Sequence, residues 1–376
     1  SPLCSALVGA MEVTVTDDTH LTLSFPGAGA GAGFHELMPY IQGMCIVNES
    51  YCETIISDPN EDLGLNVDGT GSYMLESVSD NGDVTLTRFA DAWAPATIET
   101  IYLKYITGSQ ETAFEAGDLD YAVYGATNYA IIQGFDNVQT QEQVLNGIVY
   151  LINNCVEGQP TADQNVRDAI AHCLSIEDIA AIASSDAGTP AYNIATPLVE
   201  YYADVAEHVT VDVEAANARM TEAGYSESNP LQIRLIVLSA YPDWVAACEV
   251  VKEMLEQSYF SVTIEQVADT SRYFIQDFDI AMLSVGLTTQ FNSYAQLYDD
   301  STGLNQSGID DPDVQAAFAA MTDEASTQAA MKIATESRAY IPIYYPTSFY
   351  AFDANLNPGP YYTQFSAFMY RDFSWK

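Results

Sequence analysis

The sequence contains very few basic residues. Its 376 residues include 11 Lys and Arg against 52 Asp and Glu, which gives a formal net charge of −41 at pH 7. So few cations cannot neutralise a phosphate backbone, so nucleic-acid binding is excluded and an anionic membrane surface is disfavoured. The scarcity of bases fits an acidic or salty extracellular setting, exposure to proteases that cut after Lys or Arg, or simply the composition of the lineage.

Long apolar runs are also missing. No run reaches the roughly eighteen residues that a membrane-spanning helix needs. The chain starts at Ser1 rather than Met, and "SPLCSALVGAMEV" lacks the basic region of a signal peptide. We therefore expect the numbering to start inside a longer or processed protein. The hydrophobic fraction of 48% is enough for a large core, and the length suits two or three domains.

Motifs for metal binding and catalysis are absent. The six Cys include no CxxC and no Cys/His pair at zinc spacing, and the four His show no HxxH or HxxxH. No GxSxG occurs either. The sequence therefore predicts neither an enzyme nor a cofactor. By sequence distance, Cys45 with Cys52 and Cys155 with Cys173 are predicted disulfides, and buried free thiols are the alternative.

Two glycine-rich segments raise the question of a phosphate loop. "GAGAGAG" at 27–33 never gives G-x-G-x-x-G, because Ala32 or Phe34 occupies a required position, and no GK[ST] exists. "DGTG" at 68–71 is not followed by a helix, so it cannot direct helix amides at a phosphate. We interpret the first segment as a loop and the second as a structural turn.

Two acidic loops invite comparison with calcium sites. Asp58, Asn60 and Asp62 have calcium-loop spacing but lack Gly at the sixth position and Glu at the twelfth. The second acidic loop is 298–313. In so acidic a chain both are interpreted as solvated loops, and calcium binding is left open.

The first part of the chain reads as antiparallel β structure. Apolar and polar residues alternate over 11–25 and 71–89, and the second hairpin carries Asn81-Gly82 at its turn. An alternating strand follows over 98–106. A short helix ended by Gly117 leads into the next strand.

The second part changes to α/β. A helix is predicted over 165–182, and another is capped by Asp212 and ended by Gly224. "PLQIRLIVLS", "DWVAACEVVKEMLEQ" and "FSVTIEQV" form a strand, helix and strand, so a parallel pair is expected. "FDIAMLSVG" is a further strand. A helix at 312–339 then leads into a β return.

Tyrosine is abundant. Many of the 25 Tyr fall in predicted loops. Tyr combines a flat apolar ring with a polar tip, which suits a wet binding cleft. The alternative is that Tyr replaces Lys and Arg at partly exposed positions.

Five segments in order resemble a known family. They are "DGTGSYMLESVSDNGDVTLTRFADAW", "IETIYLKYITGSQETAFEAGDLDYA", "VYLINNCVEGQPTADQNVRDAIAHCLSIEDI", "VDVEAANARMTEAGY" and "YIPIYYPTSFYAF". In the third, Asn153, Val166 and Arg167 match the family pattern. Together they resemble the extracellular solute-binding proteins of family 5, the oligopeptide, dipeptide and nickel receptors of ABC importers.

The resemblance implies an α/β, two-lobed periplasmic-binding-protein-like fold of class II (cluster C), truncated in lobe I. Lobe I would comprise 1–150 and the return at 346–376, and lobe III 151–345. The chain would cross between lobes near Asn153 and Tyr345. Such receptors close on a ligand held between their lobes.

The sequence departs from the family in three places. The family has a long segment before the strand that matches "EVTVTDDTHLTL", and it is absent here. Where the family carries an aspartate for a peptide's amine, this chain reads "VGLTTQFNSY", so no carboxylate partner for an ammonium group is predicted there. Ile176 stands where the family often has Arg.

The resemblance implies a non-catalytic receptor for a peptide or other small solute, which works with an ABC transporter permease. It would be extracellular, as a surface-anchored lipoprotein or a periplasmic protein. The alternative is a structural or assembly protein that reuses the fold, with possible self-assembly. The predicted ligand-binding residues are Tyr124, Asn128, Tyr129, Asn153, Thr289, Gln290 and Asn292.

Overall fold

The structure is a computed structural model that describes residues 12–24, 48–57, 68–287, 289–300, 303–363 and 366–376. The chain divides into two compact units. Unit 1 comprises Ser1–Tyr40 and Val144–Thr347, and unit 2 comprises Ile41–Gln143 and Ser348–Lys376. Across these described ranges, no helix is long and apolar enough to cross a membrane.

Unit 1 is built on a six-stranded mixed sheet in the order β11-β10-β12-β8-β13-β9. β10 pairs in parallel with β11 and β12, as the predicted strand–helix–strand unit requires, whereas β8 pairs antiparallel with β12 and β13. The strands are β8 (Gly147–Asn153), β9 (Thr189–Pro190), β10 (Leu231–Leu238), β11 (Phe260–Val267), β12 (Ile280–Gly286) and β13 (Tyr340–Tyr345).

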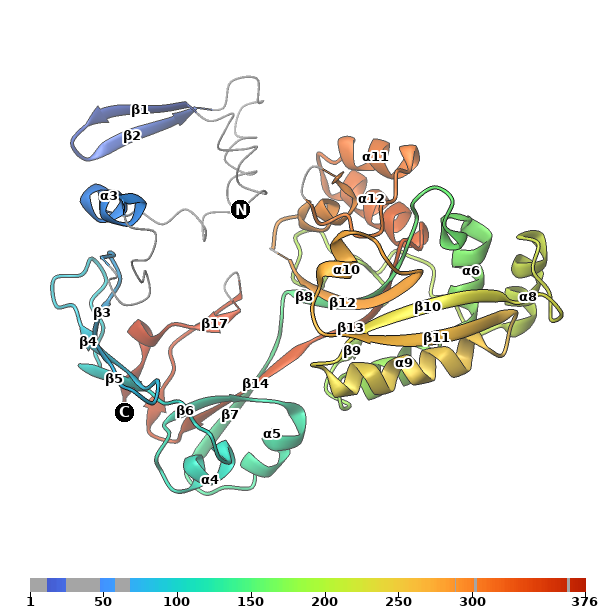
Figure 1. Cartoon of the computed structure of the whole chain (residues 1–376). Coiled ribbons are helices and arrows are strands. Elements are labelled where there is room, and N and C mark those ends of the chain that lie inside the picture. Colours follow the sequence, from blue (N-terminus) through green and yellow to red (C-terminus); the bar gives the residue numbers. More distant parts are fainter. Residues whose placement is uncertain (1–11, 25–47, 58–67, 288, 301–302, 364–365) are drawn as a thin grey trace. The chain divides into compact units, whose positions relative to one another are not determined.

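Both faces of this sheet are covered. All seven residues of β8 are buried, and their side chains alternate between two cores. Val149 and Leu151 pack in one core, and Ile148, Tyr150 and Ile152 pack in the other. Figure 1 shows α9 on one side of the sheet and α11 and α12 on the other. A strand buried on both faces reads as a continuous apolar run, as "GIVYLI" does.

The helices of unit 1 confirm the predicted caps. The side chain of Asp212 accepts a hydrogen bond from the amide of Ala215 at the start of α8, and Gly224 follows the helix with a φ of 92°. The helices are α6 (Gln164–Cys173), α7 (Ile176–Ala183), α8 (Val213–Glu222), α9 (Pro242–Leu255), α10 (Ser271–Phe274), α11 (Pro312–Ala319) and α12 (Glu324–Glu336), with short 3₁₀ turns at Pro160–Ala162 and Ser293–Tyr298.

Two helices predicted as continuous are each broken in two. The segment 165–182 ends one helix at Cys173 and starts the next after Ser175, whose hydroxyl caps the amide of Asp178. The segment 312–339 breaks at Ala320, and Asp323 starts α12 with a capping box to Ser326. In both places a capping side chain competes with continuation of the helix, which the apolar period alone does not reveal.

Unit 2 contains two three-stranded sheets and an aromatic core. β3 (Tyr73–Val78), β4 (Val84–Arg88) and β5 (Thr100–Leu103) form one sheet. β6 (Tyr121–Tyr124), β14 (Thr347–Asp353) and β7 (Val138–Val144) form the other. The core gathers Tyr350, Phe352, Leu356, Phe368 and Phe373. The remaining elements are α3 (Glu49–Ser57), α4 (Gln110–Glu115), α5 (Ala126–Ile132), β15 (Leu356–Asn357), β16 (Tyr361–Tyr362), β17 (Ala367–Phe368), a 3₁₀ turn at Tyr370–Asp372 and β18 (Ser374–Trp375).

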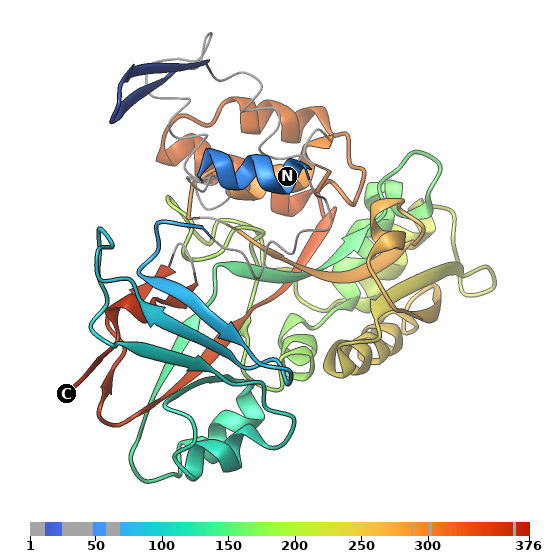
Figure 2. The same cartoon turned by 60° about the vertical axis from the view of Figure 1, so that its left-hand side comes forward.

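The local predictions for the first part of the chain hold. β1 (Glu12–Asp17) and β2 (His20–Ser24) form the first hairpin, and Asn81-Gly82 turns the second. The DGTG turn leads into strand β3, not into a helix. Figure 2, turned from the view of Figure 1, shows the two helices α4 and α5 beside the strands of unit 2. The glycine loop at 27–33 and the acidic loop at 58–64 lie outside the described residues.

The predicted Cys155–Cys173 disulfide is wrong, because both residues are free thiols. Cys173 is buried in the core on one face of the unit 1 sheet, and Cys155 packs against the core on the other face. The sheet therefore separates them, which sequence distance cannot show. Cys52 is also a free thiol, and its predicted partner Cys45 lies outside the described residues. Burial raises the pKa of the Cys155 thiol to about 11.

Candidate functional site

Three strand ends meet where the chain passes between the units. The chain enters unit 1 at Val144 and leaves it at Thr347. The amide of Leu145 donates to the carbonyl of Pro346 at 2.8 Å, and the amide of Leu287 donates to the carbonyl of Asn146 at 2.7 Å. We call this end of the sheet, formed by 145–147, 286–287 and 345–346, the crossing edge.

Thr289, Gln290 and Asn292 follow β12 directly at the crossing edge. All three are half-buried. The carbonyl of Thr289 accepts from the amide of Glu200 at 2.8 Å, and the carbonyl of Gln290 accepts from the amide of Ser293 at 3.0 Å. The structure therefore brings these three predicted residues together in one short turn, with their backbone held in place.

Glu200 and Tyr201 belong to the same place. Tyr201 is one of the tyrosines in predicted loops that the sequence offers for a binding cleft, whereas Glu200 was not singled out. The rings of Tyr201 and Phe291 lie 6.0 Å apart, centre to centre. Tyr201 has a φ of 64°, a strained backbone for a residue with a Cβ. The charge of Glu200 raises the pKa of the Tyr201 phenol. A carboxylate is thus present beside the turn that lacks acids, supplied by a segment about ninety residues away in the sequence.

Buried polar side chains lie directly under the crossing edge. Asn146 is 5% exposed, and its Oδ1 accepts a hydrogen bond from the hydroxyl of Thr196, which is fully buried. The Nδ2 of Asn146 has no acceptor among the described residues. A buried donor without a partner is unusual in a folded protein.

Asn153 lies at the other end of the sheet. It pairs with Ile280 at the start of β12, whereas Gly286 at the end of β12 pairs with Gly147. The seven residues of β12 place these two ends roughly 20 Å apart. The side chain of Asn153 is fully buried, and its Nδ2 donates to the carbonyl of Arg338 at 2.7 Å. The structure therefore does not bring Asn153 together with Thr289, Gln290 and Asn292.

The other three predicted residues belong to unit 2. Tyr124, at the end of β6, is buried and packs its ring edge-on against Phe114. Burial raises the pKa of its phenol to about 12. Tyr129, on α5, is buried with its ring 4.7 Å from that of Phe349. Asn128 is exposed on the same helix. Both tyrosines thus contribute to the packing of unit 2.

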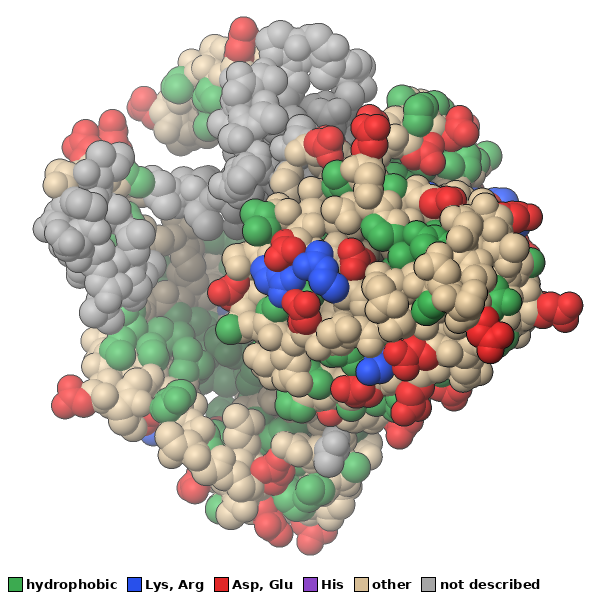
Figure 3. Space-filling model, turned by 45° about the vertical axis from the view of Figure 1, so that its right-hand side comes forward, with side chains coloured by type: hydrophobic (Ala, Val, Ile, Leu, Met, Phe, Trp, Pro, Cys, Tyr) green, Lys and Arg blue, Asp and Glu red, His purple; other side chains and the backbone are tan. Residues whose placement is uncertain are grey.

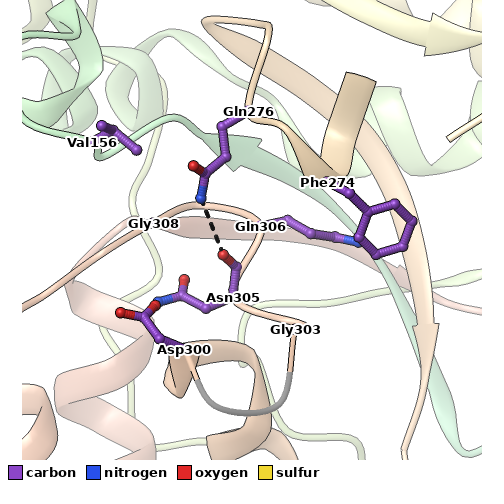
Figure 4. A pocket seen from close by; sticks show the side chains of 8 residues that line it. All are labelled: Val156, Phe274, Gln276, Asp300, Gly303, Asn305, Gln306 and Gly308. Carbon is purple, nitrogen blue, oxygen red and sulfur yellow. Dashed lines mark hydrogen bonds between the residues drawn. The ribbon is translucent and has the colours of Figure 1, made fainter. Parts of the chain in front are cut away.

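A cavity of unit 1 lies at the end of the sheet that carries Asn153. It has a volume of about 420 Å³ and is shown in Figure 4. Gln276 Nε2 donates to the carbonyl of Asn305 at 3.4 Å, and Asn305 Nδ2 donates to Asp300 Oδ1 at 2.7 Å. Gly308 has a φ of 63°, and a Cβ there would meet Val156 at 2.6 Å. These polar groups hold the loop together, so we assign them a structural role.

The charged side chains on the visible surface of unit 1 are mostly acidic. Figure 3 shows acidic side chains over the visible face, with basic side chains gathered among them. Arg234 and Arg272 both bind Asp277 at 2.9 Å, and Arg272 also binds Glu265 at 2.6 Å. The ordinary role of a cation here is to pair with nearby carboxylates. Within the described part of the chain, no cluster of three His, Cys, Asp or Glu could hold a metal ion, including at 303–313.

The family of the chain follows from its match to a family model. The model for bacterial extracellular solute-binding proteins, family 5 Middle, matches residues 7–354. The chain belongs to this family. The resemblance of the five motifs is therefore confirmed, as is the mixed α/β, periplasmic-binding-protein-like fold.

Solved structures of similar fold come from several bacteria. The chain matches the ABC transporter substrate-binding protein CtaP of Listeria monocytogenes with a TM-score of 0.82 and 16% identity, over 100% of this chain and 82% of that one. It matches the oligopeptide-binding protein AppA of Bacillus subtilis, solved with a nonapeptide, with a TM-score of 0.78 and 18% identity, over 99% and 79%. It matches NikA of Staphylococcus aureus, solved with Ni(L-His)2, with a TM-score of 0.75 and 16% identity, over 100% and 83%. No curated protein sequence gives a significant match.

Proposed function

We propose that the chain is the solute-binding component of an ABC importer and captures a peptide or another small solute. The observation that carries the proposal is the family match over residues 7–354. Substrate-binding proteins in similar structures are solved with a nonapeptide and with the peptide STSA, which makes a peptide the first ligand class to test. The chain is a binding protein and not an enzyme in this proposal.

The ligand contacts on unit 1 are assigned to the crossing edge. Thr289, Gln290 and Asn292 offer hydroxyl and amide groups that bind main-chain donors and acceptors of an extended solute. Glu200 is the only charged residue that we include in the proposed site, and its carboxylate can pair with an ammonium group of the solute. Of the three predicted residues in unit 2, only Asn128, which is exposed, stays in the proposed site. Tyr124, Tyr129 and Asn153 support the fold instead.

The partner is an ABC transporter permease, and the place of action is outside the cytoplasmic membrane, on the cell surface or in a periplasm. A strongly negative receptor is repelled by anionic lipid headgroups, so a lipid anchor would be the means of holding it near its membrane. No observation on the described residues favours the alternative of a structural protein that assembles with itself.

The experiment is hydrogen exchange of the protein with and without a mixed library of short peptides. Bound peptide should protect amides at 286–292 and 199–202, because the ligand covers these turns. Asn292→Ala should weaken binding about tenfold, the effect of losing one good hydrogen bond to the ligand. Gln306→Ala, in the cavity at the opposite end of the sheet, is the matched control and should bind like the unchanged protein.

One result would contradict the assignment of the site to the crossing edge. It is wrong if peptides bind and Asn292→Ala binds as tightly as the unchanged protein while Gln306→Ala does not. Absence of any bound peptide would instead contradict the ligand class.

A further inference from the structure

The cavity of about 420 Å³ at the Asn153 end of the unit 1 sheet contains a polar atom that its own loop does not use. Gln306 lines the cavity and is 6% exposed, and its Oε1 has no hydrogen-bond partner among the described residues. A buried acceptor without a donor costs free energy, because it has lost its contact with water and gained no partner in return. A molecule that donates a hydrogen bond inside the cavity would remove this cost.

Gln276 offers a donor at the same cavity. Its Nε2 donates to the carbonyl of Asn305 at 3.4 Å, which is longer than the usual range for such a bond and therefore weak. A ligand can take over this donor through a shorter hydrogen bond at little cost in free energy. Figure 4 shows that Gln276 and Gln306 come from two different segments, the turn after α10 and the loop at 303–308.

The backbone that carries these two amides is fixed by hydrogen bonds. The amide of Cys155 donates to the carbonyl of Ser307 at 2.7 Å, and Asn154 Nδ2 donates to the carbonyl of Gln276 at 2.9 Å. The hydroxyl of Ser307 also donates to Asn305 Oδ1 at 2.9 Å. The two segments therefore keep their places when the cavity is filled, and a ligand would bind without having to order them.

An exposed aromatic ring forms part of the cavity wall. Phe274, the last residue of α10, lines the cavity and is 57% exposed, so much of its ring is left uncovered. An uncovered ring beside amide groups suits a ligand that has an apolar face and a polar edge. A sugar ring has this form, because its C–H groups make apolar faces and its hydroxyls, which both donate and accept, surround the edge.

The charges at the cavity narrow the class of ligand further. Asp300 is the only charged residue among the described residues that line it, so nothing there attracts an anion. Asp300 already accepts a hydrogen bond from Asn305 at 2.7 Å, and the described residues provide no cluster of three metal ligands. The volume lies within the range of small-molecule sites, which starts at about 300 Å³. A neutral ligand rich in hydroxyls therefore fits the cavity best.

We propose that this cavity is a second ligand site and that it binds a neutral hexose, either free or as the end unit of a glycan. One face of the sugar packs on Phe274. One hydroxyl donates to Gln306 Oε1, and another accepts from Gln276 Nε2. The site lies within unit 1, at the end of the sheet opposite the crossing edge, so it does not depend on the proposed solute site.

The test is saturation-transfer NMR of the protein with glucose, galactose and mannose, each titrated alone. At least one of the three should bind with a Kd on the order of 1 mM, as expected for a few hydrogen bonds and one stacked face. The uronic acid with the same ring should bind at least about tenfold more weakly, because Asp300 repels its carboxylate. A tetrasaccharide of the same sugar distinguishes the two sources, since tighter binding of it indicates the end of a glycan and equal binding indicates the free sugar.

Two neighbouring exposed residues give a matched pair of variants. Phe274→Ala removes the ring from the cavity wall, whereas Ile275→Ala shortens a side chain that is 72% exposed and does not line the cavity. The affinity for the hexose should fall at least about tenfold in Phe274→Ala and stay unchanged in Ile275→Ala. Gln306→Ala, which removes the buried acceptor, should also lose at least about tenfold. If Gln306→Ala does not fold by circular dichroism, Gln276→Ala replaces it.

Any of three results would overturn the proposal. The first is no saturation transfer to any of the three hexoses at about 10 mM, roughly ten times the expected Kd. The second is equal binding of a hexose and its uronic acid. The third is equal affinity of Phe274→Ala and Ile275→Ala, because the sugar would then bind somewhere else on the protein. None of these measurements uses a peptide, so they do not depend on whether the crossing edge binds a solute.

Discussion

Arg167 shows how one cation is used in the interior of unit 1. It is 5% exposed, and its guanidinium donates to the carbonyls of Ser337, Thr161 and Ala162 at 2.8, 2.9 and 2.7 Å. It thereby ties the start of α6 to the turn before β13. Its planar fork of donors satisfies several main-chain acceptors at once, which a lysine cannot do.

Replacing Arg167 with Met should lower the free energy of unfolding by about 3 kcal/mol, because two buried carbonyls and one partly buried carbonyl lose their donor. Urea unfolding followed by circular dichroism measures the change. Arg219→Met is the control, since Arg219 is half-exposed and pairs with Glu222 at 3.4 Å, and it should cost less than about 0.5 kcal/mol. Equal effects of the two changes would contradict the role given to Arg167.

Asp277 ties together two arginines at the surface of unit 1. The hydrogen bond from Arg234, aided by the charge of Arg272, holds the pKa of the Asp277 carboxyl below its usual value. A carboxyl with a lowered folded pKa stabilises the protein above its unfolded pKa of about 3.9, and this contribution is lost as pH falls through the folded value. Because the side chain is about half exposed, the contribution at neutral pH is about 1 kcal/mol at most.

Asp277→Asn should therefore lower the melting temperature by a constant amount from pH 7 to about pH 5, and the difference should shrink below about pH 4. Thermal melting of both proteins across this range checks it. The control variant is Asp136→Asn, which removes an exposed carboxyl of unit 2 and should change the melting temperature little. If the difference in melting temperature between the two proteins grows as the pH falls, the inferred lowering of the Asp277 pKa is wrong.

Among the elements, β9 depends on a close approach that requires glycine. A Cβ on Gly188 would meet ring atoms of Tyr344 at 2.3 and 2.8 Å and the Cβ of Ser184 at 2.9 Å. Tyr344 pairs with Pro190 of β9, and its hydroxyl accepts from Trp244 Nε1 at 3.0 Å. The Tyr344 ring is thus held by both its backbone and its hydroxyl, so moving it aside would cost free energy.

Gly188→Ala should lower the free energy of unfolding by about 2 kcal/mol, the usual cost of forcing a methyl group into a packed core. Gly286→Ala is the control, because nothing lies within 4 Å of a Cβ there. The control should stay within about 0.5 kcal/mol in the same urea titration. An unchanged Gly188→Ala protein would mean that Tyr344 has room to shift.

Local signals in the sequence were enough to predict most elements. Asn81-Gly82 marked a hairpin turn, and Asp212 and Gly224 marked both ends of α8, because each acts within a few residues. The helix breaks at Ser175 and Asp323 were missed, since capping residues also occur inside helices. Cys155 and Cys173 lie against opposite faces of the sheet that contains β8. This sheet forms by pairing between distant strands, so the distance between the two cysteines in the sequence cannot predict their separation.

The candidate site could be predicted only in part. Thr289, Gln290 and Asn292 could be named as candidates because they follow a recognisable strand in a family pattern. Glu200 and Tyr201 join them through a contact between distant segments, and "VEYYADV" carries no motif that indicates it. Asn153 was matched to the family pattern from the sequence, and its side chain is buried at the far end of β8.

For the whole molecule, the dominant physical feature is the net charge of −41. Repulsion among carboxylates disfavours the compact state, and salt screens it. The melting temperature at pH 7 should therefore rise as salt increases from about 0.01 M to about 0.1 M, which shortens the Debye length from about 30 Å to about 10 Å. Choline chloride should act like sodium chloride. A rise with sodium alone would indicate specific ion binding instead of screening.

The central claim is that this chain binds a peptide as its solute, and isothermal titration calorimetry with peptides selected from the short-peptide library tests it most directly. We expect saturable binding of one peptide per chain, weakened about tenfold by Asn292→Ala and unchanged in Gln306→Ala. The peptide that binds should also raise the melting temperature, because it binds only the folded state. No saturable heat with any selected peptide, together with an unchanged melting temperature, would contradict the account.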